Sequence, residues 1–459
     1  MIQVQDKFTH RVHKELEETS VEAARAMLNK ALVGSKRMRR MPVHERARIL
    51  EATSESLRKN ARMLAETIAI EAGKPIKYSL KEAGRAAVTM KFSAEEAKRI
   101  HGETVPFDAE PRGEGMFAYY VREPVGVVFA ITPFNDPLNL VAHKLGPAIA
   151  SGNSTILKPS LLTPLSAIRL VDLTRSAGLP DECAQVLVAR GDSEPVRELL
   201  REDRIKVVSF TGGTEAAAEI VRRGGVKKYS MELGSNSPVI LWEDADLDRA
   251  VPQVVDAAFE SQGQNCIHAQ RVLVHARIYD EVRERILEAT RRLKVGNPLS
   301  EDTDVGPMIT EREAQRVADW VQEAIQGGAQ VLAGGERQGS VYPPTVLEGV
   351  SPKSRIAQQE IFGPVTILFR ISSLDEAIEL SNSVPYGLQA GVFTNDLAVA
   401  QKCVQGLEYG SVLINQTSDF RVDFMPFGGF KHSGLGREGI RFAIEAMTEI
   451  KLVVYQGAG

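Results

Sequence analysis

Cysteine is scarce in this sequence, and its placement excludes several kinds of protein. Only 3 of the 459 residues are cysteine, and Cys183, Cys266 and Cys403 lie far apart without a CxxC spacing. An odd number of distant thiols supports neither a disulfide framework nor a zinc site. We therefore expect no metal centre, and we expect a reducing cytoplasm as the compartment.

An excess of charge of one sign is also missing. The chain carries 56 Lys and Arg against 60 Asp and Glu, so its formal net charge is −4. Nearly balanced charge gives no strong field that would attract nucleic acid or an anionic membrane. No apolar run at the N-terminus reaches the length of a signal peptide or a membrane span. We expect a soluble protein whose partners are small molecules and copies of itself.

The first hundred residues have the pattern of a helical layer. Residues 20–101 show helical apolar spacing with charged residues on the other face. Breaks are expected at Gly34, at Met41-Pro42 and at Gly73-Lys74-Pro75, because glycine and proline interrupt helices.

From Val121 onward the pattern changes to an alternation of short β-branched runs and helices, and a second alternation begins after Gly234. Such alternation is typical of parallel sheets covered by helices on both faces. The expected strands are 125–131, 155–157, 206–210, 239–241, 271–274 and 365–369, and the expected helices are 166–177, 215–223, 246–261, 278–293 and 312–327. The strand-like segments 116–121 and 450–455 belong to neither alternation. At 459 residues, two or three domains are expected.

Three short runs carry groups suited to chemistry. GQNC (263–266) puts a thiol after a helix, and MELGSN (231–236) puts a carboxylate at the junction of the two alternations. TPFND (132–136) follows a strand directly, and loops at the carboxyl ends of parallel strands are where such folds bind ligands. A lone cysteine is more often a small buried hydrophobe, which is our interpretation of Cys183 and Cys403.

Together with FTGGTE (210–215), EIFGPV (360–365) and PFGGFKHSGLGREG (426–439), these runs resemble the aldehyde dehydrogenase superfamily over essentially the whole chain. Among the members of this superfamily, the motifs are most similar to those of lactaldehyde and phosphonoacetaldehyde dehydrogenases. The resemblance implies an α/β fold with two doubly wound parallel-sheet domains and a small β oligomerisation arm. It assigns residues 1–114 and 130–233 to a Rossmann-like dinucleotide-binding domain, 234–425 to a catalytic domain, and 115–129 with 440–459 to bridging strands.

The resemblance also implies the catalytic roles. Cys266 would be the nucleophile, and Glu232 the base that activates water against a thioester. The Asn135 amide and the Cys266 N–H would form an oxyanion hole, because an alkoxide needs preorganised donors. Glu438 would relay protons to Glu232, with a purely structural role as the alternative. The run GLGREG (434–439) fits a dinucleotide fingerprint but lacks the βαβ unit that such a fingerprint needs.

The implied cofactor is NAD or NADP. Lys158 would bond the adenosine ribose, and Glu360 with Phe362 would hold the nicotinamide ribose. Leu161 replaces a glutamate that many NAD-selective members carry three residues after the lysine, so the preference between the two cofactors stays open. The full set of expected cofactor residues is Thr132, Pro133, Phe134, Lys158, Ser160, Phe210, Gly212, Gly213, Thr214, Leu233, Gly234, Glu360 and Phe362.

Arg85 and Arg421 suggest the substrate class. The resemblance implies that Arg85 lines the substrate tunnel and that Arg421 lies in the loop at the tunnel mouth. Together with Asn135, the two arginines would hold a carboxylate, phosphonate, phosphate or sulfonate of a small anionic or hydroxylated aldehyde. Solvated surface arginines are the alternative. Two other functions also stay open: a dehydrogenase that transfers the acyl group to coenzyme A, and a catalytically silent dinucleotide-binding protein. The two extra strands predict a homodimer or homotetramer.

Overall fold

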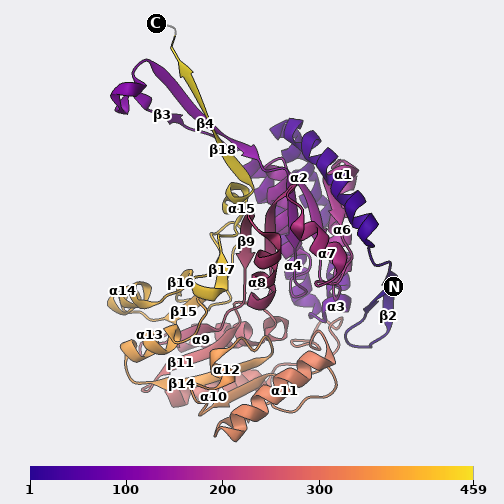
Figure 1. Cartoon of the computed structure of the whole chain (residues 1–459). Helices are drawn as coiled ribbons and strands as arrows, with labels where there is room; N and C mark the ends of the chain where they lie inside the picture. The colour runs from indigo at the N-terminus through magenta and orange to yellow at the C-terminus, as the bar shows by residue number, and fades with distance from the viewer. Residues whose placement is uncertain (458–459) are drawn as a thin grey trace.

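The computed structural model describes residues 1–457, which form two α/β bodies and a projecting arm (Figure 1). The six-stranded sheet of the first body has the order β17-β9-β8-β5-β6-β7, and the seven-stranded sheet of the second has the order β12-β13-β14-β11-β10-β15-β16. Both sheets are parallel except for β17 and β12, which pair antiparallel at the edges.

The helical layer predicted for the N-terminal region is present. It consists of α1 (Val21–Arg40), α2 (Val43–Lys59), α3 (Ala61–Ala72) and α4 (Ile76–Ala97). Two of the three predicted breaks are confirmed, but α1 runs through Gly34. A β-carbon at Gly34 would collide with the backbone carbonyl of Glu182. This glycine therefore serves the close approach of another segment and does not end the helix.

The first sheet is covered on both faces. Its strands are β5 (Val127–Ile131), β6 (Ser154–Lys158), β7 (Ala184–Val186), β8 (Ile205–Thr211), β9 (Lys228–Glu232) and β17 (Gly434–Leu435), and its connecting helices are α5 (Asn139–Ala150), α6 (Pro164–Ser176), α7 (Glu194–Arg201) and α8 (Thr214–Gly224). Ala130 and Leu157 pack into the core formed with α2 to α6, whereas Phe129 and Ile156 pack against α1, α7 and α8. Successive side chains along each strand thus point to opposite faces of the sheet and enter two separate hydrophobic cores, as expected for a sheet covered by helices on both faces.

The second sheet repeats this construction. Its strands are β10 (Ser237–Leu241), β11 (Ala269–His275), β12 (Gln330–Ala333), β13 (Thr345–Glu348), β14 (Val365–Ile371), β15 (Gln389–Phe393) and β16 (Ser411–Ile414). Val239 and Val272 face the core of α9 (Leu247–Phe259) and α10 (Tyr279–Arg291). Ile240 and Leu273 face α11 (Glu311–Gln326), α12 (Arg355–Gln358), α13 (Leu374–Asn382) and α14 (Leu397–Gly406).

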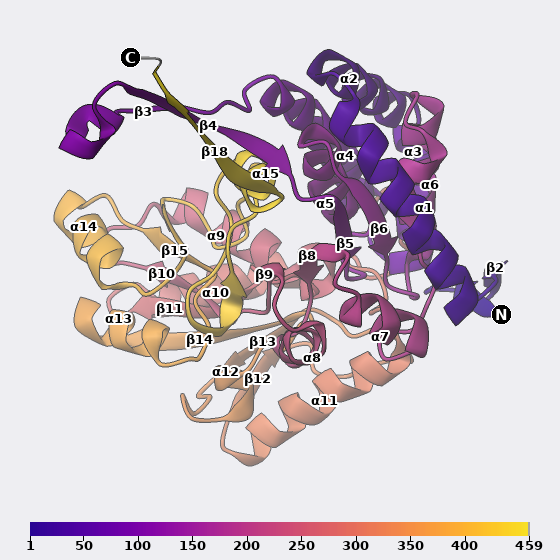
Figure 2. The same ribbon diagram turned by 45° about the horizontal axis from the view of Figure 1, so that its top comes forward.

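The arm is a three-stranded antiparallel sheet that extends away from both bodies in Figures 1 and 2. β4 (Met116–Pro124) pairs with β18 (Thr448–Gln456) along its length and with the short β3 (Thr104–Val105). The two strand-like segments outside the α/β alternations therefore pair with each other. The boundaries differ from the sequence-based ones, because residues 127–129 belong to β5, and α15 (Ile440–Ala446) packs under α5 before β18 begins.

An N-terminal hairpin of β1 (Ile2–Gln5) and β2 (Val12–Leu16) had no counterpart in the sequence analysis. Only β1 buries alternate residues, and β2 is almost entirely exposed, so its sequence carries little apolar periodicity. Among residues 1–457, no helix has both the length and the apolar character needed to cross a bilayer.

Candidate active site

Four parallel strands of the first sheet end at the same level and create one edge of the site. Ile131 on β5 pairs with Lys158 on β6 and with Phe210 on β8, and Phe210 pairs with Met231 on β9. The loops that follow these strands, including the TPFND run, leave from this carboxyl edge. This is the edge at which open α/β sheets bind ligands.

The second sheet contributes the opposite kind of edge. Gly234, Cys266 and Phe362 each stand three residues before a strand, namely β10, β11 and β14. Because these strands are adjacent and parallel in the sheet, the three residues lie at their amino ends. Cys266 therefore approaches the first body from the amino edge of its own sheet, a position that the carboxyl-end rule does not predict.

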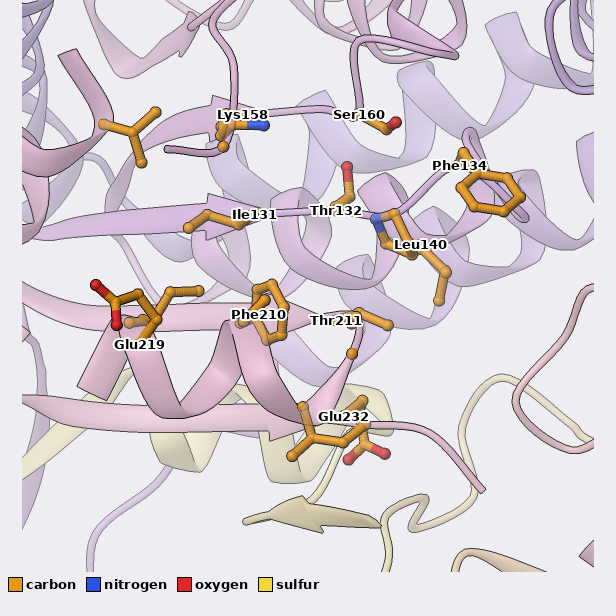
Figure 3. A pocket seen from close by; sticks show the side chains of 18 of the residues that line it. Ile131, Thr132, Phe134, Leu140, Lys158, Ser160, Phe210, Thr211, Glu219 and Glu232 are labelled. Atoms are coloured by element: carbon orange, nitrogen blue, oxygen red, sulfur yellow. The ribbon is translucent and has the colours of Figure 1, made fainter. Parts of the chain in front are cut away.

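A cavity of about 770 Å³ lies between these two edges. Figure 3 shows that its side chains come from successive strands, with Lys158, Ile131, Phe210 and Glu232 on four of them. Of the residues expected at the site, those that line the cavity are Thr132, Pro133, Phe134, Asn135, Lys158, Ser160, Phe210, Gly212, Gly213, Glu232, Leu233, Gly234, Cys266, Glu360 and Phe362. Thr214, Glu438, Arg85 and Arg421 are outside the lining.

A strained turn positions Cys266. Ser261 and Gln262 have φ values of 52° and 58°, a left-handed conformation that is rare for residues with a side chain. Gly263 has φ 63°, and a β-carbon there would collide with the carbonyl of Gly363. Only glycine fits this contact, which holds the thiol loop against the segment that carries Phe362. Phe362 and Phe134 meet edge to face at 5.7 Å between ring centroids.

The thiol of Cys266 lies in a desolvated environment. It is only partly exposed and packs against a small apolar cluster that includes Phe427. Burial raises the pKa of Cys266 well above its usual range, and the nearby carboxylates of Glu360 and Glu232 raise it further. A thiol in this state is protonated at neutral pH, so it needs a base to become a nucleophile.

Glu232 is a buried carboxyl group without a hydrogen-bond partner among the described residues. It is 2% exposed at the end of β9, and neither carboxyl oxygen is hydrogen-bonded within residues 1–457. Burial raises the pKa of Glu232 well above its usual range, and the charge of Glu438 adds to this effect. Polar groups buried without a partner are rare and often mark catalytic positions.

Glu438 has the opposite surroundings. Its carboxylate accepts hydrogen bonds from Lys144 Nζ at 3.1 Å, Arg421 at 3.0 Å and Thr211 Oγ1 at 3.2 Å. Burial works against ionisation, but Lys144 and Arg421 overcome it and hold the pKa of Glu438 far below its usual range. Arg421 also stacks on the Phe427 ring at 3.7 Å from the centroid, which links this ion-pair cluster to the apolar cluster around Cys266.

Comparison with known proteins decides what kind of site this is. The model of the aldehyde dehydrogenase family matches residues 1–453. The chain belongs to the aldehyde dehydrogenase family. The resemblance stated from the motifs is thereby confirmed, together with the class of enzyme.

Several aldehyde dehydrogenases are similar to this chain over nearly its whole length. Aspartate-semialdehyde dehydrogenase 1 of Pseudomonas canavaninivorans is 50% identical over 420 residues, which cover 92% of this chain and 89% of the relative. The 3-sulfolactaldehyde dehydrogenase of Priestia aryabhattai is 45% identical over 412 residues, which cover 90% of this chain and 86% of the relative.

Solved aldehyde dehydrogenase structures confirm the predicted fold. Aldehyde dehydrogenase 21 from Physcomitrella patens, in complex with the reaction product succinate, has a TM-score of 0.97 at 38% identity, covering 100% of this chain and 95% of that one. Glyceraldehyde-3-phosphate dehydrogenase from Methanocaldococcus jannaschii, complexed with NADP, has a TM-score of 0.95 at 36% identity, covering 99% of each chain.

Both arginines that were expected to hold the substrate are paired with carboxylates of the protein. Arg85 lies 2.9 Å from Asp423 and 3.4 Å from Asp136, and its side chain is 26% exposed. Arg421 is 7% exposed and pairs with Glu438. The two arginines belong to one network that runs through Asp423 and His143. Asp423, the partner of Arg85, is 3.0 Å from the His143 ring, and the same ring is 3.5 Å from Arg421. Neither arginine of this aldehyde dehydrogenase is a solvated surface residue, and Arg85 is the more accessible.

The sequence analysis missed the groups that hold these arginines. Asn139, His143 and Lys144 lie on α5, where all twelve residues are buried. Asn139 and His143 are one helical turn apart and both donate to Asp423. A signal was available, since three polar side chains interrupt an otherwise apolar helix, and fully buried polar residues are unusual.

Proposed function

We propose that this aldehyde dehydrogenase oxidises a small anionic or hydroxylated aldehyde to its carboxylate, with NAD or NADP as hydride acceptor and Cys266 as covalent nucleophile. The observation that carries the proposal is the shared cavity. A thiol and an unpaired buried carboxyl group line the same space as Lys158 and Glu360, so nucleophile, base and dinucleotide site are in reach of one another.

The residues present fit a dinucleotide. Lys158 is 6% exposed, and within residues 1–457 its ammonium bonds only the carbonyl of Pro159, at 3.3 Å. A buried cation without a counter-charge suits ribose hydroxyls or phosphate oxygens. Gly212 and Gly213 line the cavity at the N-terminus of α8, where free N–H groups and the helix dipole favour a pyrophosphate. The chemistry that the dinucleotide supplies when bound is acceptance of a hydride from the substrate.

Cys266 and Glu232 divide the remaining chemistry between them. The Cys266 sulfur forms a bond to the aldehyde carbon, and the thiol proton passes to the Glu232 carboxylate. The Asn135 amide and the Cys266 N–H donate to the alkoxide that develops. Loss of the hydride leaves a thioester on Cys266. Glu232 gives up the thiol proton before the second half of the reaction. Its carboxylate then removes a proton from water as the water attacks the thioester carbon. The carbon–sulfur bond breaks, the sulfur takes back a proton, and the product leaves as its carboxylate.

Glu438 is placed to support Glu232 in this scheme. It is ionised and lies between Lys144 and Arg421, and its charge contributes to the raised pKa of Glu232. A base with a raised pKa binds a proton more strongly, which helps it to accept protons from the thiol and from water. We propose that Glu438 acts on Glu232 through its charge and not as a relay of protons, because Lys144 and Arg421 keep it ionised and make it a weak proton acceptor.

The anionic substrate class is supported by two observations. The first is the group formed by Arg85, His143 and Arg421 beside the apolar cluster that holds Cys266. The second is that three of the relatives named above act on, or hold as product, molecules with an acidic group away from the reacting carbon: aspartate semialdehyde, 3-sulfolactaldehyde and succinate. In our proposal, the substrate anion bonds Arg85, whose guanidinium keeps solvent-facing area.

Transfer of the acyl group to coenzyme A is the competing activity. Glu232 favours hydrolysis, because a carboxyl group with free oxygens next to the thioester can activate water. The deciding experiment is a panel of anionic and neutral aldehydes with NAD or NADP, in which reduced cofactor and product are measured with and without coenzyme A. Free carboxylate without coenzyme A supports the proposal, and turnover that requires coenzyme A contradicts it. Absence of turnover with every aldehyde, despite cofactor binding, would favour a silent dinucleotide-binding protein.

We also propose a homodimer or homotetramer that works in the cytoplasm. The arm exposes Phe117, Ile450, Leu452, Val454 and Tyr455 on adjacent strands. An exposed apolar sheet of this kind is typical of a surface that pairs with another copy of the chain. Light scattering at micromolar concentration tests this assembly, and a monomer would contradict it.

A further inference from the structure

A tight turn between α3 and α4 joins the two bodies (Figure 1). Gly73 ends α3 with φ 71°, and a β-carbon there would collide with the carbonyl of Pro307 in the second body. A β-carbon at Gly306 would in turn collide with the carbonyl of Gly73. The two glycines therefore let the backbone of one body touch the backbone of the other. At the start of α4, the N–H of Ile76 adds a hydrogen bond to the carbonyl of Pro298, at 2.7 Å.

The carbonyl of Gly73 holds the turn that carries the thiol. Gln262 is 1% exposed, and its side-chain amide donates to this carbonyl and, at 2.8 Å, to the carbonyl of Pro307. The Gln264 side chain accepts a hydrogen bond from the backbone of the same segment of the second body, at 3.0 Å. Gln262 has φ 58°, and a left-handed conformation of this kind persists only where the surroundings fix it. The position of Cys266 therefore depends on the contacts of Gln262.

Lys74, the next residue, holds the loop on the other side of the site. It is 3% exposed, and its ammonium bonds Asp136 and, at 2.6 Å, Glu82. Burial disfavours the charged ammonium, but the two carboxylates outweigh burial and keep the pKa of Lys74 above its usual range. Glu82 also accepts the N–H groups of Leu138 and Asn139, at 2.8 Å and 3.2 Å. One ammonium thus fixes the loop with the TPFND run at two points.

The contacts of this dipeptide lead to both expected donors of the oxyanion hole. Asp136 directly follows Asn135, and Gln262 stands four residues before Cys266. Asn135 belongs to the first body and Cys266 to the second, so the spacing of the two donors depends on how the bodies meet. An oxyanion hole requires both donors to be preorganised where the charge develops, and a displacement of about 1 Å can reduce the rate by about a hundredfold.

We infer that Lys74 and Gln262 are positioning residues, and that the Gly73–Lys74 turn fixes the Asn135 amide and the Cys266 N–H at the spacing that the alkoxide requires. This inference rests on the proposed function, because it assigns the groups that hold the oxyanion hole of that reaction. Lys74 and Gln262 are outside the lining of the cavity. Each therefore acts through the loop that it holds. A purely structural role would stabilise the contact between the bodies without a selective effect on the reaction.

Two mild variants test the positioning role in the kinetics. Asp136→Asn removes the charge that Lys74 holds, and Gln262→Met removes the amide that bonds Gly73. Each should reduce kcat for aldehyde oxidation by about tenfold to a hundredfold. KM for the aldehyde and Kd of the dinucleotide should change by less than about threefold. The aldehyde is a neutral one, because Asp136 also faces Arg85, the residue proposed to hold a substrate anion.

Lys77→Met is the matched control. Lys77 lies on the first turn of α4 and also joins the two bodies, but its ammonium bonds Asp304 instead of either loop. This variant should keep the kcat of the wild type. A fall in kcat as large as that of Asp136→Asn would show that any weakened contact between the bodies slows the reaction, and it would overturn the inference.

Alkylation of Cys266 by iodoacetamide separates misplaced donors from a damaged thiol. This substitution forms no alkoxide, so it does not use the oxyanion hole. In Asp136→Asn, the rate of alkylation should stay within about threefold of the wild type, because the thiol and its surroundings are unchanged. Oxidation should fall in the same variant. Equal losses in both reactions, or a loss in neither, would overturn the inference.

Hydrogen exchange tests the turn without catalysis. Lys74→Met should accelerate exchange by about tenfold in residues 132–139 and in residues 260–267, because both loops lose the turn that holds them. The core strands β8 and β11 should exchange as in the wild type. Faster exchange in only one loop would show that no shared turn holds the two donors. If Lys74→Met does not fold, Asp136→Asn and Gln262→Met give the same measurement for each loop, and unchanged exchange in both would overturn the inference.

The outcomes distinguish this inference from the proposed function. If the wild type oxidises no aldehyde but loss of the turn loosens both loops, the proposed function fails and the turn still positions Asn135 and Cys266. If aldehydes are oxidised and the two mild variants keep the kcat of the wild type, the positioning role fails and the proposed function stands.

Discussion

Glu232 and Glu438 are two buried carboxyl groups in one electrostatic field, and their pKa values move in opposite directions. Burial disfavours ionisation of both. At Glu438, the positive charges of Lys144 and Arg421 outweigh burial, and the pKa falls. Glu232 has no hydrogen-bond partner in the part of the chain that the structure describes, so burial and the charge of Glu438 together raise its pKa. The pair therefore consists of one fixed anion and one group that is ready to exchange a proton.

We expect Glu438→Gln to change the pH dependence of turnover. In the wild type, kcat should rise with pH as Glu232 loses its proton, because hydrolysis requires the carboxylate. Removing the charge of Glu438 removes a cause of the raised pKa of Glu232, and it leaves the positive charges of Lys144 and Arg421 less compensated. The rising limb of the profile should therefore move to lower pH. Glu445→Gln, on an exposed helix face, is the control. An unchanged limb would show that Glu438 does not act on the base.

Cys266→Ala should abolish oxidation and leave dinucleotide binding nearly intact. The thiol forms the covalent bond in the proposed mechanism, whereas the cofactor contacts expected of Lys158 and Glu360 do not involve it. Reduced-cofactor absorbance reports turnover, and quenching of intrinsic fluorescence reports binding. Cys403→Ala provides the comparison, because this thiol is buried in the core of the second sheet. Turnover that survives in the Cys266 variant contradicts covalent catalysis at this position.

Glu232→Gln should complete the first half of the reaction and then stall. The acyl-enzyme forms once, so a rapid burst of reduced cofactor is expected with an amplitude near one per active site. Steady-state turnover should then fall by about a hundredfold or more, because hydrolysis lacks its base. Stopped-flow absorbance and the mass of the intact acylated chain measure these two events. Normal steady-state turnover would place the base elsewhere.

Arg85→Ala should separate an anion site from a purely structural ion pair. A charge-assisted bond to the substrate predicts a loss of about tenfold to a hundredfold in kcat/KM for an anionic aldehyde. A neutral aldehyde of equal length should be affected little, since Asn139 and His143 still hold Asp423. Lys81→Ala, one turn earlier on α4 and paired with Glu260, is the matched control. Equal losses for both aldehydes, or none for either, would remove Arg85 from substrate recognition.

Two helical glycines should respond to alanine in opposite directions. Gly84 is exposed within α4, and a β-carbon there meets nothing within 4 Å, so Gly84→Ala should stabilise the fold by about 0.5–1 kcal/mol. Gly34→Ala in α1 would push a methyl group into the carbonyl of Glu182 and should destabilise it by about 1–3 kcal/mol. Thermal unfolding of both variants beside the wild type measures the contrast. A Gly34 variant as stable as the wild type would mean that the two segments separate easily.

The sequence by itself determined the α/β class, most of the helices and the central strands of both sheets, and its motifs, through the family resemblance, identified most of the residues that line the cavity. These features depend on local causes, because apolar periodicity selects helix or strand, and short motifs bring their own backbone geometry. The TPFND run, for example, follows β5 directly, so the strand alone sends Asn135 to the edge of the sheet. The hairpin β1–β2 was missed for the same reason, since β2 has almost no buried face and hence no periodic signal.

Only the tertiary structure decided how the charges are paired and from which edge the thiol enters. Arg85 meets a carboxylate 338 residues away, and Lys144 meets one 294 residues away. No local pattern encodes such a pairing, because it depends on how two sheets and a C-terminal loop come together. No local pattern encodes the edge from which Cys266 enters the site either. The rule that ligands bind at the carboxyl ends of parallel strands would place this residue at a carboxyl edge. It lies at an amino edge because the second sheet faces the first in the reverse sense, and that orientation is fixed by packing between the two bodies.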